Sequence, residues 1–337
     1  MKKAVTAAGA GVGILILILD GQTALLGAME GLELCLKSVI PSLFPFLFLC
    51  GILTNALWGS QMKLLTPLCR KLGIPQGAES LLIAAFLGGY PAGARTVGQS
   101  WREGRLTRED ALHLLRFCSN AGPAFLFGMT ALQFPDLKTV WALWVIQILS
   151  ALIVGSFFHH RPENAASLSP GSNSVTAILT GSVKTMGVLC GWIILFRMVT
   201  EYLTRWFFWM LPPEHQVLLM GLLELSNGCC ILSRIPDLSL RFCVCSAILS
   251  FGGICVAIQT ASVISDLPLK PYLGGKAFQT AMSLPLSLLY LRTGWAGLSA
   301  VTVLLFLVLV KKEVDFQKNT LYNALTNTRR EKNHAVS

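Results

Sequence analysis

The stretch FLGGYPAGART (residues 86–96) places three glycines and a proline within six residues, directly after the apolar run 81–87. A helix interior penalises each glycine by about 1 kcal/mol and each proline by about 3 kcal/mol. The stretch therefore predicts a break in a segment that is otherwise apolar enough to enter a membrane.

The composition is that of a polytopic membrane protein. Of the 337 residues, 53% are hydrophobic and 13% are charged, and the mean hydropathy is +0.62. Soluble domains carry about 25% charged residues, and a membrane span needs about 20 predominantly apolar residues. Candidate segments lie at residues 4–19, 38–57, 81–97, 114–132, 139–158, 175–202, 216–232, 240–264, 272–290 and 295–310. Several are short or carry Gly and Pro, so we expect fewer full crossings than segments.

The formal charge of +10 comes from Lys and Arg in the connections between these segments. This distribution is typical of cytoplasmic loops, and we expect no nucleic-acid partner. The ten cysteines are scattered through apolar runs, which predicts neither a disulfide framework nor a zinc site. The first 21 residues resemble a signal peptide, but no small-residue cleavage site follows the apolar core, so we expect a retained first helix.

Two similar units follow the first helix and its connection. We divide the chain into the first transmembrane helix and connection (1–30), a first repeat (31–158), a polar loop (159–174), a second repeat (175–310) and a basic tail (311–337). Asp20 and Glu30 flank the connection. Each repeat reads as a long helix, a short Gly-interrupted segment, a broken helix and an ordinary span. The predicted fold class is an all-α polytopic membrane protein with two inverted repeats, an arrangement common in secondary transporters.

Four breaks are predicted at membrane depth, at residues 88–93, 119–123, 224–228 and 250–253. Unwound backbone in lipid must be buried in protein or line a watery cavity. We therefore expect re-entrant hairpins whose tips expose peptide groups and helix ends to a polar solute. The predicted substrate-binding residues are Gly88, Gly89, Tyr90, Pro91, Gly93, Ser119, Asn120, Gly122, Glu224, Ser226, Asn227, Gly228, Ser250, Gly252, Gly253 and Gln259.

Each of these residues could instead have a purely structural role. Small and hydroxyl side chains also pack helices together, and Glu224 could form a structural pair rather than bind a proton, a cation or a solute. We expect Arg197 to pair locally with Glu201, and the loop residues His159 and His160 to have no carboxylate partner. No catalytic, metal or cofactor site is predicted.

The broken segments also carry a family resemblance. The chain is similar to the sporulation integral membrane proteins of the YlbJ type, within the nucleoside-recognition Gate domain membrane proteins, in the stretches PSLFPFLFLCGIL (41–53), GGYPAGAR (88–95), SNAGPAFLFG (119–128), GLLELSNG (221–228) and SFGGICVAIQTASVI (250–264). The resemblance implies the inner membrane of a spore-forming bacterium, a role in spore cortex formation and hairpins akin to those of concentrative nucleoside transporters. It supplies no substrate.

Two functions are compatible with these features. The first is a secondary transporter or flippase-like carrier of a small polar solute, with a midplane site at the hairpin tips and with the coupling proton or cation left open. The second is a non-transporting scaffold that recruits sporulation partners through its loops and tail. Neither is an enzyme, both are embedded in the lipid bilayer, and a homo-oligomer is left open.

Overall fold

The computed structural model describes residues 2–60, 62, 63, 65–158, 160–162, 174–264 and 266–307. These residues form helices and short connections, with no strand among them. Four helical stretches in this part are long and apolar enough to cross a membrane: Gly21–Leu57, Leu137–Phe157, Val175–Trp206 and Leu238–Ile264. The protein is therefore a multi-pass membrane protein. The predicted tail and most of the predicted polar loop lie outside the described residues.

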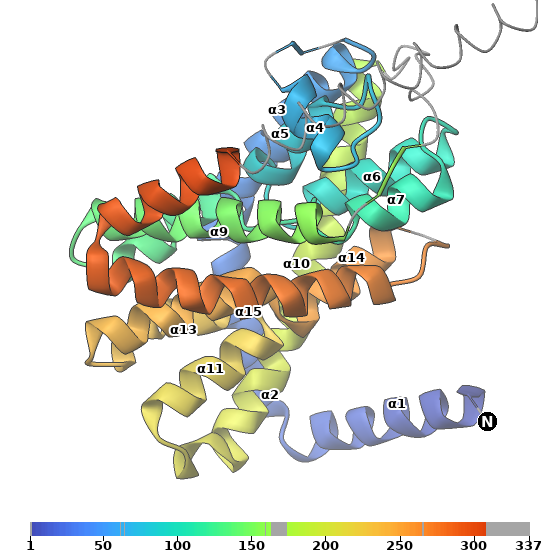
Figure 1. The fold of residues 1–337 in the computed structure, drawn as a ribbon. Coiled ribbons are helices and arrows are strands. Elements are labelled where there is room, and N and C mark those ends of the chain that lie inside the picture. Colours follow the sequence, from blue (N-terminus) through green and yellow to red (C-terminus); the bar gives the residue numbers. More distant parts are fainter. Residues whose placement is uncertain are drawn as a thin grey trace, which may run out of the picture.

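The N-terminal region differs from the prediction. Helix α1 (Lys2–Leu19) is followed directly by α2 (Gly21–Leu34), so the expected connection after Asp20 is helical. The Asp20 side chain accepts a hydrogen bond from the backbone N–H of Thr23, as a helix N-cap does. This cap lets the chain begin a new helix at once, and α1 extends away from the remaining helices (Figure 1).

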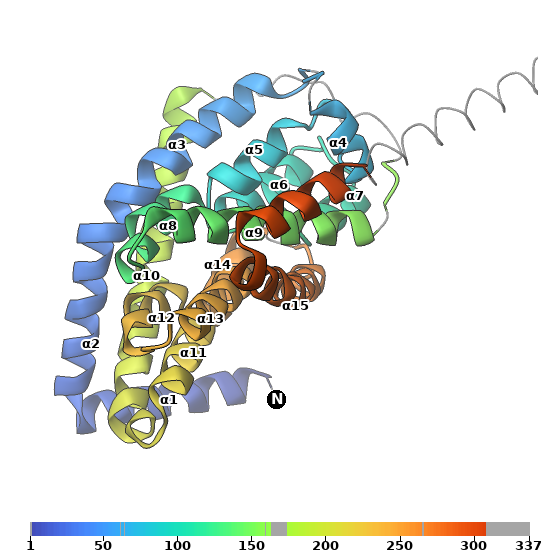
Figure 2. The same ribbon diagram turned by 60° about the vertical axis from the view of Figure 1, so that its left-hand side comes forward.

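Helix α2 continues into α3 (Ile40–Leu57) through a π-helical turn, η1 (Cys35–Val39). Pro41 and Pro45 follow this turn, and neither can donate a backbone hydrogen bond. A π turn and missing donors are known causes of helix bends. Figure 2 shows the resulting change of direction between α2 and α3, beside the helix α10 (Val175–Trp206).

In each part of the chain a long helix precedes two short helices, a broken helix and another long helix, and the two parts differ in their short elements. After α3 and the short α4 (Thr66–Lys71) come α5 (Ser80–Leu87) and α6 (Ala92–Arg102), then α7 (Arg108–Leu114), α8 (Pro123–Gly128), η2 (Thr130–Gln133) and the long α9 (Leu137–Phe157). After α10 and η3 (Phe208–Met210) come α11 (Pro213–Leu223) and α12 (Leu225–Cys230), then η4 (Leu232–Arg234), α13 (Leu238–Phe251), α14 (Gly253–Ile264) and the long α15 (Lys270–Thr293). A further apolar helix covers Trp295–Leu307.

The breaks are present, three of them narrower than predicted and the one before α8 wider. Residues 88–91 separate α5 from α6, and residues 115–122 separate α7 from α8. In the second part, Glu224 alone separates α11 from α12, and Gly252 alone separates α13 from α14. The reason is local: a single Glu224 side chain caps α12, and Gly252 adopts a φ of 83°, which an L-residue rarely does. Ser226, Asn227, Gly228, Ser250 and Gly253 are therefore helical, and so is Gly93.

The broken helices lie in the interior of the bundle. Helices α9, α13 and α15 run side by side and cross the direction of α10 in the view of Figure 1. Helix α2 packs against α10. Buried apolar residues of α5, α6, α7, α9 and α14 form one core cluster, and those of α8, α9, α11, α12, α13 and α15 form another. The breaks are therefore surrounded by protein, as unwound backbone in a membrane requires.

Candidate functional site

A cavity of 320 Å³ lies where the broken elements converge. Its walls come from η1 and the start of α3, and from α8, α10 and α14. The α5–α6 break adds Tyr90, and the α11–α12 break with the start of α12 adds Glu224, Leu225 and Ser226. Ligand pockets are typically about 300–1,000 Å³, apolar and fitted with a few polar groups. The polar lining residues here include Ser38, Ser42, Tyr90, Glu224, Ser226 and Gln259. The cavity therefore has the size and lining of a small-solute site.

Glu224 is the carboxylate in this cavity wall, and it is 2% exposed. Its Oε1 accepts from the Ser226 backbone N–H at 3.0 Å, and its Oε2 accepts from the Asn227 backbone N–H at 2.7 Å. The side chain thus caps α12 and satisfies two N–H groups that would lack a helical partner. Each carboxylate oxygen has a second lone pair. The Glu224 side chain can therefore cap α12 and also bind a solute, a proton or a cation in the cavity.

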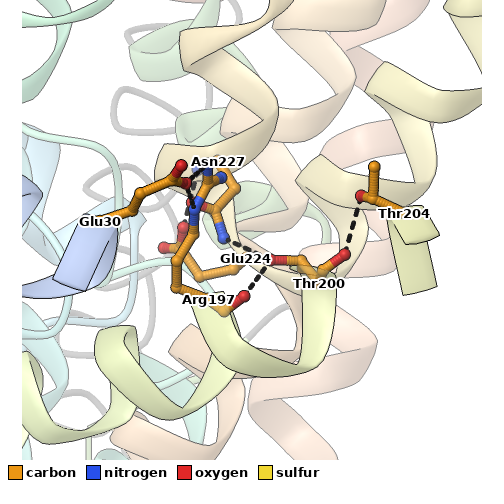
Figure 3. Close-up of polar contacts among 6 residues, drawn as sticks. All are labelled: Glu30, Arg197, Thr200, Thr204, Glu224 and Asn227. Atoms are coloured by element: carbon orange, nitrogen blue, oxygen red, sulfur yellow. Dashed lines mark hydrogen bonds and ion pairs between the residues drawn. The ribbon is translucent and has the colours of Figure 1, made fainter. Parts of the chain in front are cut away.

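The α12 cap is tied to α2 through α10 (Figure 3). Arg197 of α10 donates from Nε to Glu30 Oε2 at 2.9 Å and from Nη1 to Asn227 Oδ1 at 3.0 Å. Asn227 in turn donates from Nδ2 to Thr200 Oγ1 at 3.3 Å. The expected pair of Arg197 with Glu201 is therefore wrong: the guanidinium reaches the carboxylate of another helix. Glu30 lies within α2 and not beside a connection.

A second polar group lies directly behind the cavity and centres on Lys276 of α15, which the sequence analysis missed. Its Nζ lies 3.0 Å from Tyr90 Oη, 3.3 Å from Asn120 Oδ1 and 2.7 Å from Gln279 Oε1. Lys276 has 0% exposure, and no carboxylate among the described residues forms an ion pair with it. A buried ionisable group inside a membrane bundle is costly, and such groups are usually functional.

The partners of Lys276 fit the charged form of its amine. Both amide oxygens can only accept, and the Tyr90 hydroxyl donates its own hydrogen to the Leu249 carbonyl at 3.0 Å. Three accepting partners need three N–H donors, and only the ammonium has three. The ammonium form satisfies all three partners but bears the cost of a fully buried charge with no ion-pair partner among the described residues.

Hydrogen bonds around Lys276 connect Tyr90 and Asn120, in the breaks of the first part of the chain, with Ser250, beside the break of the second part. Gln279 Nε2 donates to Asn120 Oδ1 at 2.9 Å and to Gln147 Oε1 of α9 at 3.3 Å, and Gln147 Nε2 donates to Ser250 Oγ at 3.2 Å. We call Tyr90, Asn120, Gln147, Ser250, Lys276 and Gln279 the Lys276 network. Tyr90 also lines the cavity. A displacement of Tyr90 by a solute would therefore act on α9, α13 and α15.

Glycines allow the broken elements to approach closely. A Cβ at Gly93 would overlap the Cys118 carbonyl oxygen, and one at Gly122 would come within 2.8 Å of Gly89. In the second part, a Cβ at Gly228 would overlap Gly221. Because these contacts are with backbone atoms, a side chain at any of these positions would require the backbone itself to shift.

All but one of the predicted site residues fall into three sets. Tyr90, Gly122, Glu224, Ser226 and Gln259 line the cavity. Asn120, Ser250 and Asn227 make polar contacts behind it. The glycines, together with Pro91, shape the breaks; Gly88, for example, lies against Ala84 and Ala92, and Gly252 and Gly253 lie against Tyr90 and α11. Ser119 is buried outside the cavity, and its hydroxyl has no partner among the described residues.

A titratable cluster lies outside the candidate spans. Thr107 caps α7, because its Oγ1 accepts from the Asp110 backbone N–H at 3.1 Å. His160 Nε2 lies 2.6 Å from Asp110 Oδ1, so the expectation that His160 lacks a carboxylate partner is wrong; His159 lies outside the described residues. The His113 ring stacks on His160 and its Nε2 lies 2.7 Å from the Leu72 carbonyl oxygen. Burial lowers the pKa of His113 to about 4.

Comparison with curated proteins shows distant homology. The chain is 24% identical over 307 residues to the sporulation integral membrane protein YlbJ of Bacillus subtilis (strain 168), covering 77% of this chain and 75% of that protein. No family model matches the chain, so none supports the expected Gate domain, and no solved structure matches it. Homology to an integral membrane protein agrees with the long apolar helices.

Proposed function

We propose that the protein is a membrane carrier of a small polar solute that serves spore formation in a spore-forming bacterium. The observation that carries this proposal is the 320 Å³ cavity, because its wall takes residues from the α5–α6 break, from the α11–α12 break and from both broken helices. The distant relative is named for sporulation, and we extend that role, in cortex formation at the inner membrane, to this chain. We propose transport and not catalysis.

The like order of elements supports a carrier architecture. We propose that residues 31–158 and 175–310 are repeats of opposite topology, with α5–α6 and α11–α12 as re-entrant hairpins that meet at the cavity. Carriers of this kind move one unit against the other around a fixed site. Glu224 would supply the coupling group for a proton or cation, and the Lys276 network would transmit movement of Tyr90 to α9, α13 and α15.

Uptake into proteoliposomes tests the proposal. The purified full chain would be reconstituted and supplied with a panel of radiolabelled probes: nucleosides, amino acids and small carboxylates. We expect time-dependent accumulation of at least one probe, lowered at least tenfold by Glu224→Gln and lowered by Asn227→Ala. Glu109→Gln removes an exposed carboxylate and is the matched control. Full uptake in both site variants would end the site assignment.

A sporulation assay separates a carrier from a scaffold. A strain that depends on this chain for heat-resistant spores would receive either tail deletions within 311–337 or the cavity substitutions Glu224→Gln and Ser226→Ala. A carrier needs the cavity and tolerates tail deletion. A scaffold loses function with the tail or with substitutions in the connection 101–110 and tolerates the cavity variants.

A further inference from the structure

A second cavity, of 110 Å³, lies between the end of α3, one face of α6 and the first turn of α10. It shares no lining residue with the central cavity. The candidate span Gly21–Leu57 ends here and the span Val175–Trp206 begins here, so this cavity lies at the boundary of the apolar region. We call it the Arg95 pocket, after the residue of α6 in its wall.

Arg95 is a half-buried cation without a counter-charge in the part of the chain that the structure describes. Its guanidinium forms no hydrogen bond or ion pair with any described residue. The group packs against Gly181 of α10, and a Cβ added at Gly181 would overlap Arg95 Nη2. A guanidinium withdrawn from water is costly unless it is paired. Arg95 therefore presents an unused fork of N–H donors to the pocket.

The other charges in the wall already compensate one another. Arg105 Nη2 lies 2.7 Å from Glu103 Oε2, and its guanidinium lies over the Trp58 ring at 5.2 Å. Glu103 Oε1 accepts from Gln99 Nε2 at 2.8 Å. With this pair neutral overall, the net charge of the pocket wall is that of Arg95.

Two further features of the wall favour an anion. The Thr54 hydroxyl is buried, with the residue 5% exposed, and has no hydrogen-bond partner among the described residues. Ala177 and Ile178 belong to the first turn of α10, where Ser174 already accepts hydrogen bonds from both of their backbone N–H groups, so this helix end contributes partial positive charge but no free donor. Arg95 and Thr54, whose hydroxyl has no partner among the described residues, thus line the same small cavity beside the first turn of α10.

We propose that the Arg95 pocket binds a phosphoryl anion, with Arg95 as its bidentate partner and Thr54 as an additional donor. This site is separate from the proposed carrier function and does not depend on it. The phosphoryl group comes from one of two sources, the headgroup of an anionic phospholipid at the membrane boundary or free inorganic phosphate.

Binding to the full chain distinguishes the sources. In one arm, native mass spectrometry counts phospholipids retained by protein taken from nanodiscs of phosphatidylcholine with phosphatidylglycerol. In the other, equilibrium dialysis in neutral detergent measures binding of radiolabelled phosphate. Retention of phosphatidylglycerol over phosphatidylcholine identifies a headgroup, and saturable binding in dialysis identifies free phosphate.

The variants decide whether the pocket is responsible. We expect Arg95→Gln to weaken binding about ten- to hundredfold and Thr54→Val about three- to tenfold. Arg102→Gln removes an exposed arginine of the same helix whose charge interacts with that of Arg95, so it should weaken binding much less than Arg95→Gln does. Gly181→Ala keeps the arginine but displaces its guanidinium, so it should weaken binding even if Arg95→Gln folds poorly. Absence of binding in both arms, or equal loss in Arg95→Gln and Arg102→Gln, would overturn the proposal.

Discussion

Replacement of Lys276 by methionine should separate stability from transport. The substitution keeps an unbranched side chain that ends near the position of the lysine Cε, and it removes the amine. Asn120 Oδ1 would keep its bond from Gln279 Nε2, and Tyr90 would keep its bond to the Leu249 carbonyl. Gln279 Oε1 and the Tyr90 hydroxyl oxygen would each lose the donor that Lys276 Nζ supplies, and of these two only Gln279 Oε1 would be left with no hydrogen bond.

The free energy of unfolding should therefore change little. An unsatisfied buried acceptor costs about 1–3 kcal/mol. Removal of a buried charge that has no ion-pair partner returns a desolvation penalty of several kcal/mol. We expect the Lys276→Met protein to unfold within about 2 kcal/mol of the wild type, or to be more stable, because the two effects oppose each other.

Transport should fall in the same variant. The Tyr90 side chain lines the cavity and would lose its link to α15. We expect uptake to drop at least tenfold, measured in proteoliposomes beside thermal unfolding in detergent. Lys270→Met, at an exposed position of the same helix, is the matched control and should change neither. A loss of 3–5 kcal/mol in stability, which is typical of breaking a buried ion pair, or unchanged uptake would refute this reasoning.

Three other predictions concern the caps, the close contacts and pH. Glu224→Gln replaces one accepting oxygen of the α12 cap by a donor, so thermal unfolding should show a loss of about 1–2 kcal/mol, and an unchanged unfolding curve would contradict the cap. Gly93→Ala should lower stability by about 1–3 kcal/mol because its Cβ meets the Cys118 carbonyl, whereas Gly128→Ala, with no atom within 4 Å, should change it by less than about 0.5 kcal/mol. Burial lowers the pKa of His113 from its ordinary 6.5 to about 4, so the unfolded chain binds more protons between these values. Stability should therefore fall as pH decreases from 6.5 to 4, by up to about 3 kcal/mol; a His113→Gln variant with the same pH dependence would exclude this residue as the cause.

The helix breaks could be predicted from sequence because their causes are local. Pro91 cannot donate a backbone hydrogen bond, and Gly252 can adopt a positive φ, whatever surrounds them. The extent of each break was harder to predict. Glu224 caps α12 through its own side chain, so Ser226 and Asn227 begin a helix where an unwound stretch was expected.

The polar contacts could not be predicted because they join residues far apart in the sequence. Arg197 and its partner Glu30 are separated by 167 positions, and Lys276 and Tyr90 by 186. A lysine within the apolar segment 272–290 is a signal that the sequence does carry, since such residues are costly in membranes. Its partners depend on the packing of α15 against α9 and the two breaks.

The central claim is that the cavity opens in turn to each side of the membrane, and cysteine labelling tests it most directly. A charged, membrane-impermeant thiol reagent would be added outside, or loaded inside, oriented vesicles that contain Ser226→Cys, and labelled peptides would be read by mass spectrometry so that the native cysteines are distinguished. Ser283→Cys, at a position of α15 with 0% exposure, is the control. A carrier predicts that position 226 is labelled from both sides and position 283 from neither. Labelling of position 226 from one side only, or from neither, would contradict alternating access through this cavity.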